Sequence, residues 1–344
     1  MTLTVATEPD LDRIEGSHFT VRPEYIDFNG HMNVAYYSVL MDAACDALRE
    51  RLGLDEQSLG CAGVEWLLRQ SHIVYRRELM QGDRVNFDVQ ALDQDAHGLH
   101  FMLGLRHAGE GWLAASCEIV AGCVSKDTRE EMGWPQAARM AVARWRDAHR
   151  GRPRPAEAGR AVAVRGAMDP AALPVPSAEA RAALAACVRD ADTSDLRVGT
   201  EHVDARDRIR PGFYTVFAGR AMRRVAGPAF GMGSGNMQRT GQTGYVAESR
   251  NTQLRALRLG DPMAFDFKVA GLSDKALHIV ITLKHAGEGW IAAVHEQITL
   301  CMDAATRRPT AFHPSVRARL ESALFEHRHA PDPVPAGHPL GLGI

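Results

Sequence analysis

Residues 25–36 read Tyr-Ile-Asp-Phe-Asn-Gly-His-Met-Asn-Val-Ala-Tyr, and this stretch decides how the rest of the chain is interpreted. The aromatic and β-branched residues just before it predict an extended approach. After it, apolar residues recur at helical spacing until Gly53: Val34, Tyr37, Met41, Ala44, Cys45, Leu48 and Leu52. The stretch therefore predicts a strand-to-helix junction, with Asn29 or Gly30 near the N-cap of the helix.

Four polar side chains at this junction are candidates for catalysis: Asp27, Asn29, His31 and Asn33. Unpaired N–H groups at a helix start attract anions and polarised carbonyl oxygens, so the backbone at 31–33 is the expected oxyanion site. Asp27 could act as a general base or as a nucleophile, and His31 could orient water or the carboxylate. The simpler alternative is structural, because Asp and Asn commonly accept backbone hydrogen bonds in turns and caps.

The motif D-x-N-x-H-M-N-x-x-Y at 27–36 resembles the D-x-N-x-H-V-N-N-x-x-Y signature of plant acyl-ACP thioesterases. It is similar, more loosely, to the D-x-D-x-x-G-H-V-N motif of the 4-hydroxybenzoyl-CoA thioesterase group. Both families have the hotdog fold, an α+β fold in which an antiparallel sheet wraps around a long central helix. The resemblance implies thioester hydrolysis without a metal or redox cofactor. It also makes Asp42 a possible site residue, since many relatives carry a helix Glu there.

The chain contains an internal duplication. Residues 105–115, Leu-Arg-His-Ala-Gly-Glu-Gly-Trp-Leu-Ala-Ala, recur at 283–293 as Leu-Lys-His-Ala-Gly-Glu-Gly-Trp-Ile-Ala-Ala. The offset is 178 residues (285 − 107, from the two histidines) and holds without gaps over the flanking sequence. A match of this length indicates two copies of one structural unit.

Each copy predicts one helix followed by an antiparallel meander. In the first copy we expect strands at 71–78, 85–92, 99–106 and 112–125 and a closing helix at 136–149, matched in the second copy by a helix at 315–328. We therefore expect a tandem double hotdog. Its N-terminal unit spans 17–150 and its C-terminal unit 196–328, joined by a linker at 151–195 that contains a short helix capped by Ser177. Residues 329–344 are expected to be disordered.

The second copy has lost the motif. In its opening stretch Asp207 could match Asp27, but neither Asn nor His follows. We therefore expect a single competent cleft at the interface of the two units, which Glu248 from a strand of the second copy could complete. His107 and Trp112 recur in this degenerate half as His285 and Trp290, which favours structural roles and predicts that the two tryptophans anchor the cores.

Composition sets the limits on function. The chain has 344 residues, 45% apolar and 24% charged, with a net charge of −2, which is typical of a soluble two-domain protein and gives no nucleic-acid surface. No apolar run reaches membrane length, and we expect neither a signal peptide at residues 1–16 nor a zinc site, since no ligand cluster has the spacing for one. The six cysteines form no C-x-x-C pair, so we expect reduced thiols and a cytoplasmic location.

The expected partner is acyl-CoA, with acyl-ACP as the alternative carrier, and double hotdogs could associate further into a homo-oligomer. Two other functions are open: a hotdog hydratase or dehydratase using Asp27 and His31 as an acid–base pair, and a non-catalytic acyl-CoA-binding protein. Trp66, Tyr75 and Tyr245 could line an acyl pocket, or form a cage for a quaternary ammonium, or simply pack in the core. The cage is considered because the second copy is similar to the thioesterase-type domain of some carnitine dehydrogenases.

Overall fold

A computed structural model describes residues 18–128, 130–148, 150, 166–189, 196–328 and 330. It divides into two compact units, residues 1–160 with 339–344 and residues 161–338. Residues 151–165 and 190–195 of the expected linker, and all of the expected tail except residue 330, lie outside the described residues. Among the helices of the described ranges, none combines the length and apolarity that a membrane span requires.

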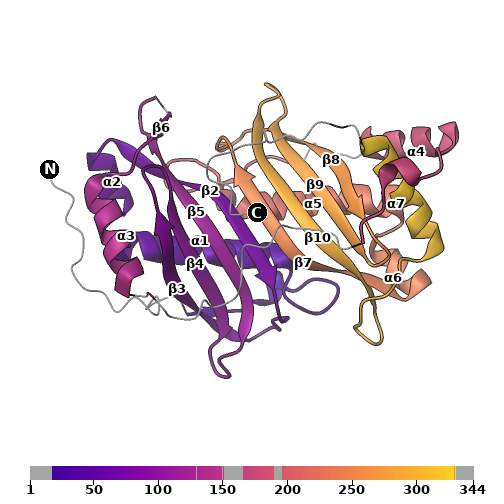
Figure 1. The fold of residues 1–344 in the computed structure, drawn as a ribbon, viewed down its shortest axis with the longest axis horizontal. Coiled ribbons are helices and arrows are strands. Elements are labelled where there is room, and N and C mark those ends of the chain that lie inside the picture. The colour runs from indigo at the N-terminus through magenta and orange to yellow at the C-terminus, as the bar shows by residue number, and fades with distance from the viewer. Residues whose placement is uncertain are drawn as a thin grey trace. The chain divides into compact units, whose positions relative to one another are not determined.

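Unit 1 is built on helix α1 (Val34–Arg51), which lies along one face of an antiparallel sheet (Figure 1). The sheet order is β1 (Phe19–Thr20), β3 (Arg84–Gln94), β4 (Leu99–His107), β5 (Leu113–Ser125) and β2 (Val64–Tyr75), with β6 (Glu131–Met132) paired to β5. Two further helices, α2 (Glu56–Cys61) and α3 (Gln136–Ala148), complete the unit. The apolar stripe predicted on α1 is buried, apart from a half-buried Val34.

Unit 2 repeats this plan around helix α5 (Gly212–Phe230). Its strands are ordered β7 (Gln242–Gln253), β10 (Ile291–Asp303), β9 (Ala276–His285) and β8 (Met263–Leu272), all antiparallel. Helices α4 (Ala178–Arg189), α6 (Ser234–Thr240) and α7 (Pro314–His327) flank the sheet. As expected, Ser177 caps α4, because its hydroxyl accepts the Ala180 N–H at 3.1 Å.

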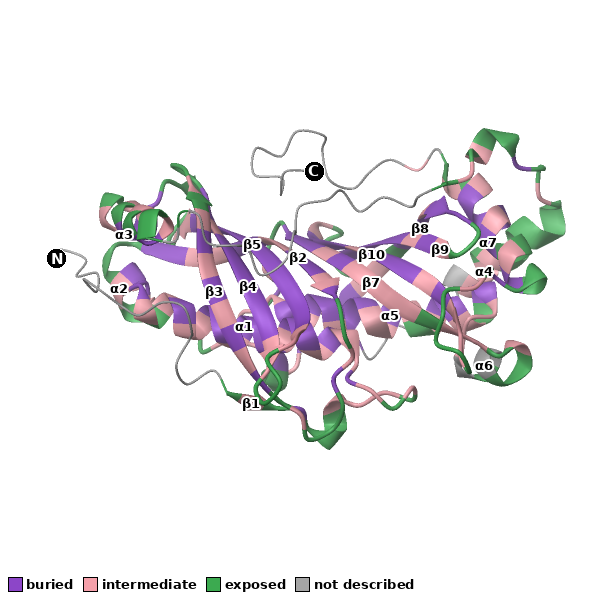
Figure 2. Ribbon diagram, turned by 60° about the horizontal axis from the view of Figure 1, so that its bottom comes forward, coloured by how far each residue is buried: buried purple, intermediate pink, exposed green. Residues whose placement is uncertain are grey.

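The buried residues lie on the same elements in both units (Figure 2). The strands and the sheet-facing sides of the two long helices carry the buried residues, whereas the short helices expose one side. Both sheets contain a β-bulge at the same place in the repeat. The bulges leave out Arg69 between Leu68 and Gln70, and Ala247 between Val246 and Glu248, which differ by the repeat offset. The duplication predicted from sequence is thus confirmed down to an irregularity of the strand pairing.

Candidate active site

Asp27 begins a tight turn that precedes α1. Its Oδ1 accepts the Asn29 N–H at 2.8 Å, and its carbonyl oxygen accepts the Gly30 N–H at 3.0 Å. Gly30 has a φ of 82°, in the left-handed region where a glycine is favoured. The Asp27 N–H donates to the His31 carbonyl oxygen at 3.0 Å. The carboxylate is therefore held in place by the backbone of its own turn.

The helix begins later than the sequence suggested. Asn33 is the N-cap, because its side-chain oxygen accepts the Ala35 N–H at 2.9 Å, so the expectation of Asn29 or Gly30 was wrong. The reason is a bridge between Ile26 and Met32, which keeps the chain extended on both sides of the turn. Asn33 is thus a structural cap in this unit.

This bridge also changes the expected oxyanion donors. The Met32 N–H donates to the Leu79 carbonyl oxygen and the Asn33 N–H to the Tyr25 carbonyl oxygen, each at 2.8 Å. Within the described residues, the junction's remaining backbone donors without an acceptor are the N–H groups of Phe28 in the turn and of His31 and Val34 at the helix start. Of the three N–H groups at 31–33 that were expected to bind the oxyanion, only that of His31 has no acceptor.

His31 contacts a carboxylate that the sequence analysis missed. Its Nε2 lies 3.4 Å from Oε1 of Glu78, and its Nδ1 lies 3.3 Å from the Met32 carbonyl oxygen. Both ring nitrogens face oxygen acceptors, so the protonated imidazole can donate to both and the neutral ring to only one. Glu78 follows the end of β2, far from the motif in sequence. A comparison of the two copies could have identified it. The copy that lacks the histidine also lacks the carboxylate, since the repeat offset pairs Glu78 with Ala256.

Unit 2 repeats the turn in nearly identical hydrogen bonds. The Asp204 N–H donates to the Arg208 carbonyl oxygen at 2.8 Å, Oδ1 of Asp204 accepts the Arg206 N–H at 2.9 Å, and the Asp207 N–H donates to the Asp204 carbonyl oxygen at 3.1 Å. Asp207 has a φ of 59° and occupies the place of Gly30. The counterpart of Asp27 is therefore Asp204. The expected match with Asp207 was wrong because the offset here is 177 (204 − 27).

The two turns differ in the side chains around the carboxylate. The positions of Asn29, His31 and Asn33 are Arg206, Arg208 and Arg210 in unit 2. The Arg208 guanidinium donates to Oδ2 of Asp204 from Nε at 3.0 Å and from Nη2 at 2.7 Å.

This arginine changes the chemistry of the carboxylate. Burial raises the pKa of Asp204, but the hydrogen bonds and charge of Arg208 outweigh it and hold that pKa below its usual value. No basic side chain of the described residues forms an ion pair with Asp27. Unit 1 thus presents a carboxylate without a paired cation, and unit 2 presents one that is already neutralised.

The two other predicted site residues lie elsewhere. Asp42 is on α1, about 12 Å along the helix axis from its start at 1.5 Å per residue, so it is not part of the turn. It is also buried rather than solvated, with 5% of its surface exposed. Glu248 is half-buried on β7 of unit 2, opposite Ile298. Asp27 and Glu248 belong to different units, so the expected contribution of Glu248 stays a prediction.

Two of the three aromatic candidates are packed within unit 1. Trp66 lies 6.4 Å from Phe101 and 5.5 Å from Trp134, as ring centroids. The ring of Tyr75 lies 5.2 Å from that of Tyr37, and its hydroxyl donates to the Val34 carbonyl oxygen at 3.4 Å. Tyr75 is buried, which supports its interpretation as a core residue, whereas Trp66 is half-buried against its aromatic neighbours. The third, Tyr245, is half-buried on β7.

The duplicated histidines are structural. His107 Nδ1 accepts the Glu110 N–H and His285 Nδ1 accepts the Glu288 N–H, each at 3.0 Å. The predicted core role of the tryptophans is confirmed in part: both are half-buried, and Trp290 packs against the hydrophobic core of unit 2. Each indole is stacked between the hairpin histidine and an arginine, Arg77 or Arg255, at the hairpin base.

Comparisons with known proteins identify the family and the fold of this chain. The sequence pattern of the family described as "Thioesterase-like superfamily" matches residues 21–148 and 198–320, one segment in each unit. The chain is 31% identical over 142 residues to the betainyl-CoA thioesterase of Pseudomonas aeruginosa, covering 41% of this chain and 89% of that protein.

Solved structures show the same fold at low sequence identity. A putative oleoyl thioesterase from Lactobacillus plantarum matches with a TM-score of 0.56 and 12% identity, covering 82% of this chain and 94% of that one. The 12:0-ACP thioesterase from Umbellularia californica matches with a TM-score of 0.56 and 10% identity, covering 83% of this chain and 92% of that one.

Proposed function

We propose that this chain, which belongs to the thioesterase-like superfamily and is a thioester hydrolase, acts at the Asp27 turn of unit 1. The proposed substrate is an acyl-CoA thioester. One observation carries the proposal. The same turn occurs in both units, but an arginine pairs with the carboxylate only in unit 2, where Arg208 binds Asp204. The Asp27 carboxylate of unit 1 has no such partner. A general base needs such a carboxylate, since an ion-paired one is a weaker proton acceptor.

In the proposed reaction Asp27 removes a proton from water as the water oxygen attacks the thioester carbonyl carbon. Oδ1 is held by the Asn29 N–H, which leaves Oδ2 to accept the proton. The tetrahedral oxyanion is stabilised by N–H groups at the helix start, for which His31 and Val34 are the available donors. Collapse of the intermediate breaks the C–S bond, and the proton passes to the departing CoA thiolate.

His31 and Glu78 act as a pair in this proposal. The Glu78 carboxylate lies 3.4 Å from His31 Nε2 and would hold the imidazole beside the turn. A histidine held in this way can orient the attacking water and stabilise negative charge that develops beside it. Unit 2 has Arg208 and Ala256 at the two positions and so lacks the pair.

The acyl group is proposed to be short and polar. The support is the likeness to a protein named betainyl-CoA thioesterase. The betainyl group of betainyl-CoA is a short acyl group that carries a trimethylammonium. Betainyl-CoA is therefore the first substrate to test, together with unsubstituted short acyl-CoA esters. The fold likeness to the oleoyl and 12:0-ACP enzymes carries no information on the acyl group at 10–12% identity.

The test is thiol release by wild type and by Asp27→Asn, with Asp204→Asn as the matched control. An Asn at 27 can still accept the Asn29 N–H, so the turn should persist while the general base is lost. We expect Asp27→Asn to lower kcat/KM by about 10²–10⁴-fold. Asp204→Asn alters the equivalent turn in unit 2 and should leave the rate unchanged.

Two results would overturn the proposal: normal turnover by Asp27→Asn, or no thiol release by the wild type from any acyl-CoA. A hydratase would consume enoyl-CoA without releasing thiol. A single turnover in H₂¹⁸O tests for attack by the Asp27 carboxylate. Attack forms a mixed anhydride with loss of the CoA thiolate, and label in Asp27 would show that water then opens this anhydride at the aspartyl carbon; general-base catalysis puts the label only in the product acid.

A further inference from the structure

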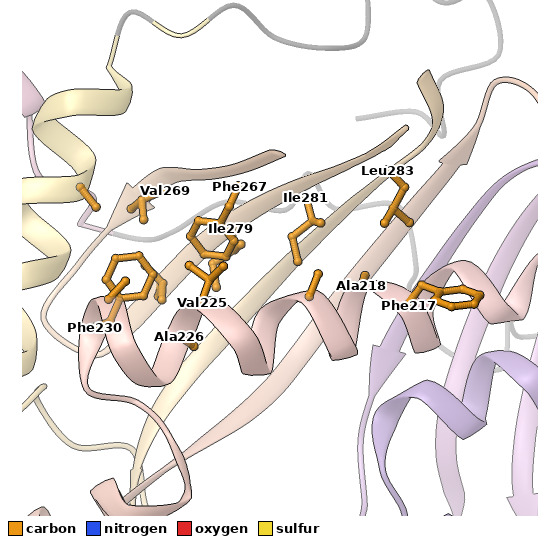
Figure 3. Packing of buried hydrophobic residues seen from close by; sticks show 14 of the residues in the cluster. Phe217, Ala218, Val225, Ala226, Phe230, Phe267, Val269, Ile279, Ile281 and Leu283 are labelled. Atoms are coloured by element: carbon orange, nitrogen blue, oxygen red, sulfur yellow. The ribbon is translucent and has the colours of Figure 1, made fainter. Parts of the chain in front are cut away.

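The Asp27 turn of unit 1 carries an exposed aromatic side chain. Phe28, the residue after the proposed general base, exposes 63% of its surface. All other phenylalanines, tryptophans and tyrosines of the chain lie in the described ranges, and each is buried or half-buried. Phe230 and Phe267, for example, pack between α5 and β8 in unit 2 with their ring centroids 5.5 Å apart (Figure 3). Phe28 is thus the one exposed aromatic ring in the part of the chain that the structure describes.

The turn does not need an aromatic residue at this position. Phe28 and Asn29 are its two central residues, and the hydrogen bonds that close it are made by the backbone and by the Asp27 carboxylate. Unit 2 forms the same turn with the same hydrogen bonds and has Ala205 in place of Phe28. An exposed ring adds no burial energy to the folded chain. Its place beside the general base therefore points to contact with a ligand.

A second exposed apolar side chain belongs to the segment that contacts the turn. Met80 exposes 49% of its surface. It follows Leu79, whose carbonyl oxygen accepts the Met32 N–H at 2.8 Å. The repeat offset places Arg258 of unit 2 at the position of Met80. Both exposed apolar side chains are therefore confined to the unit whose turn has the unpaired carboxylate.

The formal charge around the turn has opposite signs in the two units. Residues 25–33 and 78–80 of unit 1 contain two acids and neither lysine nor arginine, a charge of −2 (0 − 2, with His neutral). The matching residues 202–210 and 256–258 of unit 2 contain four arginines and two acids, a charge of +2 (4 − 2). A cationic ligand is therefore favoured beside the turn of unit 1 and disfavoured beside the turn of unit 2.

The neighbouring tyrosines have a structural role instead. Tyr25 is stacked on Tyr36 with the ring centroids 4.4 Å apart. His202 and Phe213 hold the equivalent positions in unit 2, and their ring centroids are 5.0 Å apart. A ring pair that occurs in both units belongs to the fold. The binding role is therefore assigned to Phe28, which has no aromatic counterpart in unit 2.

We propose that Phe28 and Met80 bind a quaternary ammonium on a short acyl group and so determine the acyl specificity of the unit 1 site. This inference rests on the proposed function. A quaternary ammonium spreads its charge over its methyl groups and donates no hydrogen bond, so an aromatic face, a thioether and nearby carboxylates are suited to bind it. In a betainyl group the nitrogen is separated from the thioester carbonyl carbon by a single methylene. A carbonyl held at the helix start would therefore keep the cation close to the turn.

The experiment compares two acyl groups of the same shape. Betainyl-CoA carries the cation, and 3,3-dimethylbutyryl-CoA carries a neutral tert-butyl group in its place. Wild type should hydrolyse betainyl-CoA with a kcat/KM about tenfold higher or more, because ring, thioether and carboxylates all favour the charged group. Thiol release with an equal or reversed preference would overturn the inference.

Four variants test the two residues through the ratio of the two kcat/KM values. Phe28→Leu keeps an apolar side chain but removes the ring, and should lower the ratio about three- to thirtyfold. Phe28→Tyr keeps the ring and should retain the ratio. Met80→Arg introduces the residue of unit 2 and should lower the ratio by charge repulsion. Met140→Arg is the matched control, since Met140 is 51% exposed on α3 and belongs to neither segment of the site.

The outcomes separate this inference from the function on which it rests. An unchanged ratio in Phe28→Leu, or an equal fall in Met80→Arg and Met140→Arg, would overturn the assigned residues. Sedimentation tests a second copy of the chain as the occupant. Self-association of wild type that Phe28→Leu abolishes, with no change in the ratio, would make Phe28 an interface residue instead. Absence of thiol release by wild type from these and other acyl-CoA esters would overturn the proposed function itself.

Discussion

Asp27 and Asp204 occupy the same backbone position, and their surroundings set what each can do. In both turns the carboxylate accepts the N–H two residues on and the peptide N–H donates to the carbonyl four residues on. The residue four positions after the aspartate, His31 or Arg208, makes the chemical difference. A backbone-held carboxylate is therefore necessary but not sufficient for the proposed catalysis.

The pairing of His31 with Glu78 leads to a prediction about coupling. His31→Gln and Glu78→Gln should each lower kcat/KM by about 10²–10⁴-fold, because each removes one partner of the same contact. The double variant should be no more than a few-fold worse than the poorer single variant. Steady-state kinetics of the four proteins measures this, with exposed Glu24→Gln as an unaffected control. Additive losses would show that the two residues act separately.

His295 predicts how stability depends on pH. Burial lowers its pKa to about 4 in the folded protein, from an ordinary value of 6.5. Between these values the unfolded chain binds the proton and the folded chain does not, so the free energy of unfolding falls as the pH drops. The loss from this residue should reach about 3 kcal/mol at pH 4.

Urea unfolding at pH 7, 5.5 and 4 tests this, with His295→Cys as the comparison. The variant should lose less stability on acidification than wild type, by about the same 3 kcal/mol. Burial also lowers the pKa values of His202 and His327, so some acid sensitivity should remain in the variant. Identical slopes in the two proteins would contradict the assignment.

The motif located the turn residues from sequence, but not their partners. Asp27 and His31 lie together because local backbone geometry places them there, and local patterns carry that information. Glu78 reaches His31 through tertiary packing, which no spacing within the motif encodes. The N-cap was misplaced because a bridge between Ile26 and Met32 extends the chain through Met32, and Asn29 and Gly30 are equally good caps by residue type.

At the scale of elements, the repeat and the alternation of apolar residues predicted the meander of each unit. Strands β3, β4 and β5 begin and end within two residues of the expected bounds. Strand β2 begins seven residues earlier than expected, at Val64 instead of Ser71. Its bulge at Arg69 breaks the alternation of buried and exposed residues, so the first half of the strand lacked the pattern that identifies a strand.

Gly122 on β5 gives a prediction about this bulge. A Cβ at Gly122 would collide with the guanidinium of Arg69, which is buried and pairs with Glu131 at 2.7 Å. Gly122→Ala should therefore destabilise unit 1 by about 1–3 kcal/mol through overpacking. Gly219→Ala is the matched control on α5, where the added methyl meets open space and should stabilise the helix by up to about 1 kcal/mol. Thermal unfolding of both variants measures the contrast.

At the scale of the whole molecule, the chain holds two copies of one unit with different interiors and different helix starts. The sequence predicted the duplication and the loss of the motif in the second copy. It did not predict that the polar side chains of Asn251, His295, Gln297 and Thr299 in unit 2 are buried, because polar residues on a strand indicate a solvent-facing side unless the opposite face is known. Only the folded structure shows which face of the β7–β10 sheet is covered by α5.

This asymmetry predicts one catalytic centre per chain. Titration of the Asp27→Asn variant with a short acyl-CoA, followed by calorimetry, should give a stoichiometry of one ligand per chain. The reason is that only unit 1 carries the His31–Glu78 pair beside an unpaired carboxylate. Two equal sites would show that the arginine-rich junction of unit 2 binds the thioester as well.

The shared turn has a consequence for how enzymes of this kind can diversify. Its shape is kept by main-chain hydrogen bonds that tolerate either glycine or aspartate at the left-handed position. The neighbours of the acid can therefore be exchanged while the loop keeps its course. A duplicated scaffold of this type can silence one reactive centre, or restore it, through a few side-chain replacements and without refolding the polypeptide around it.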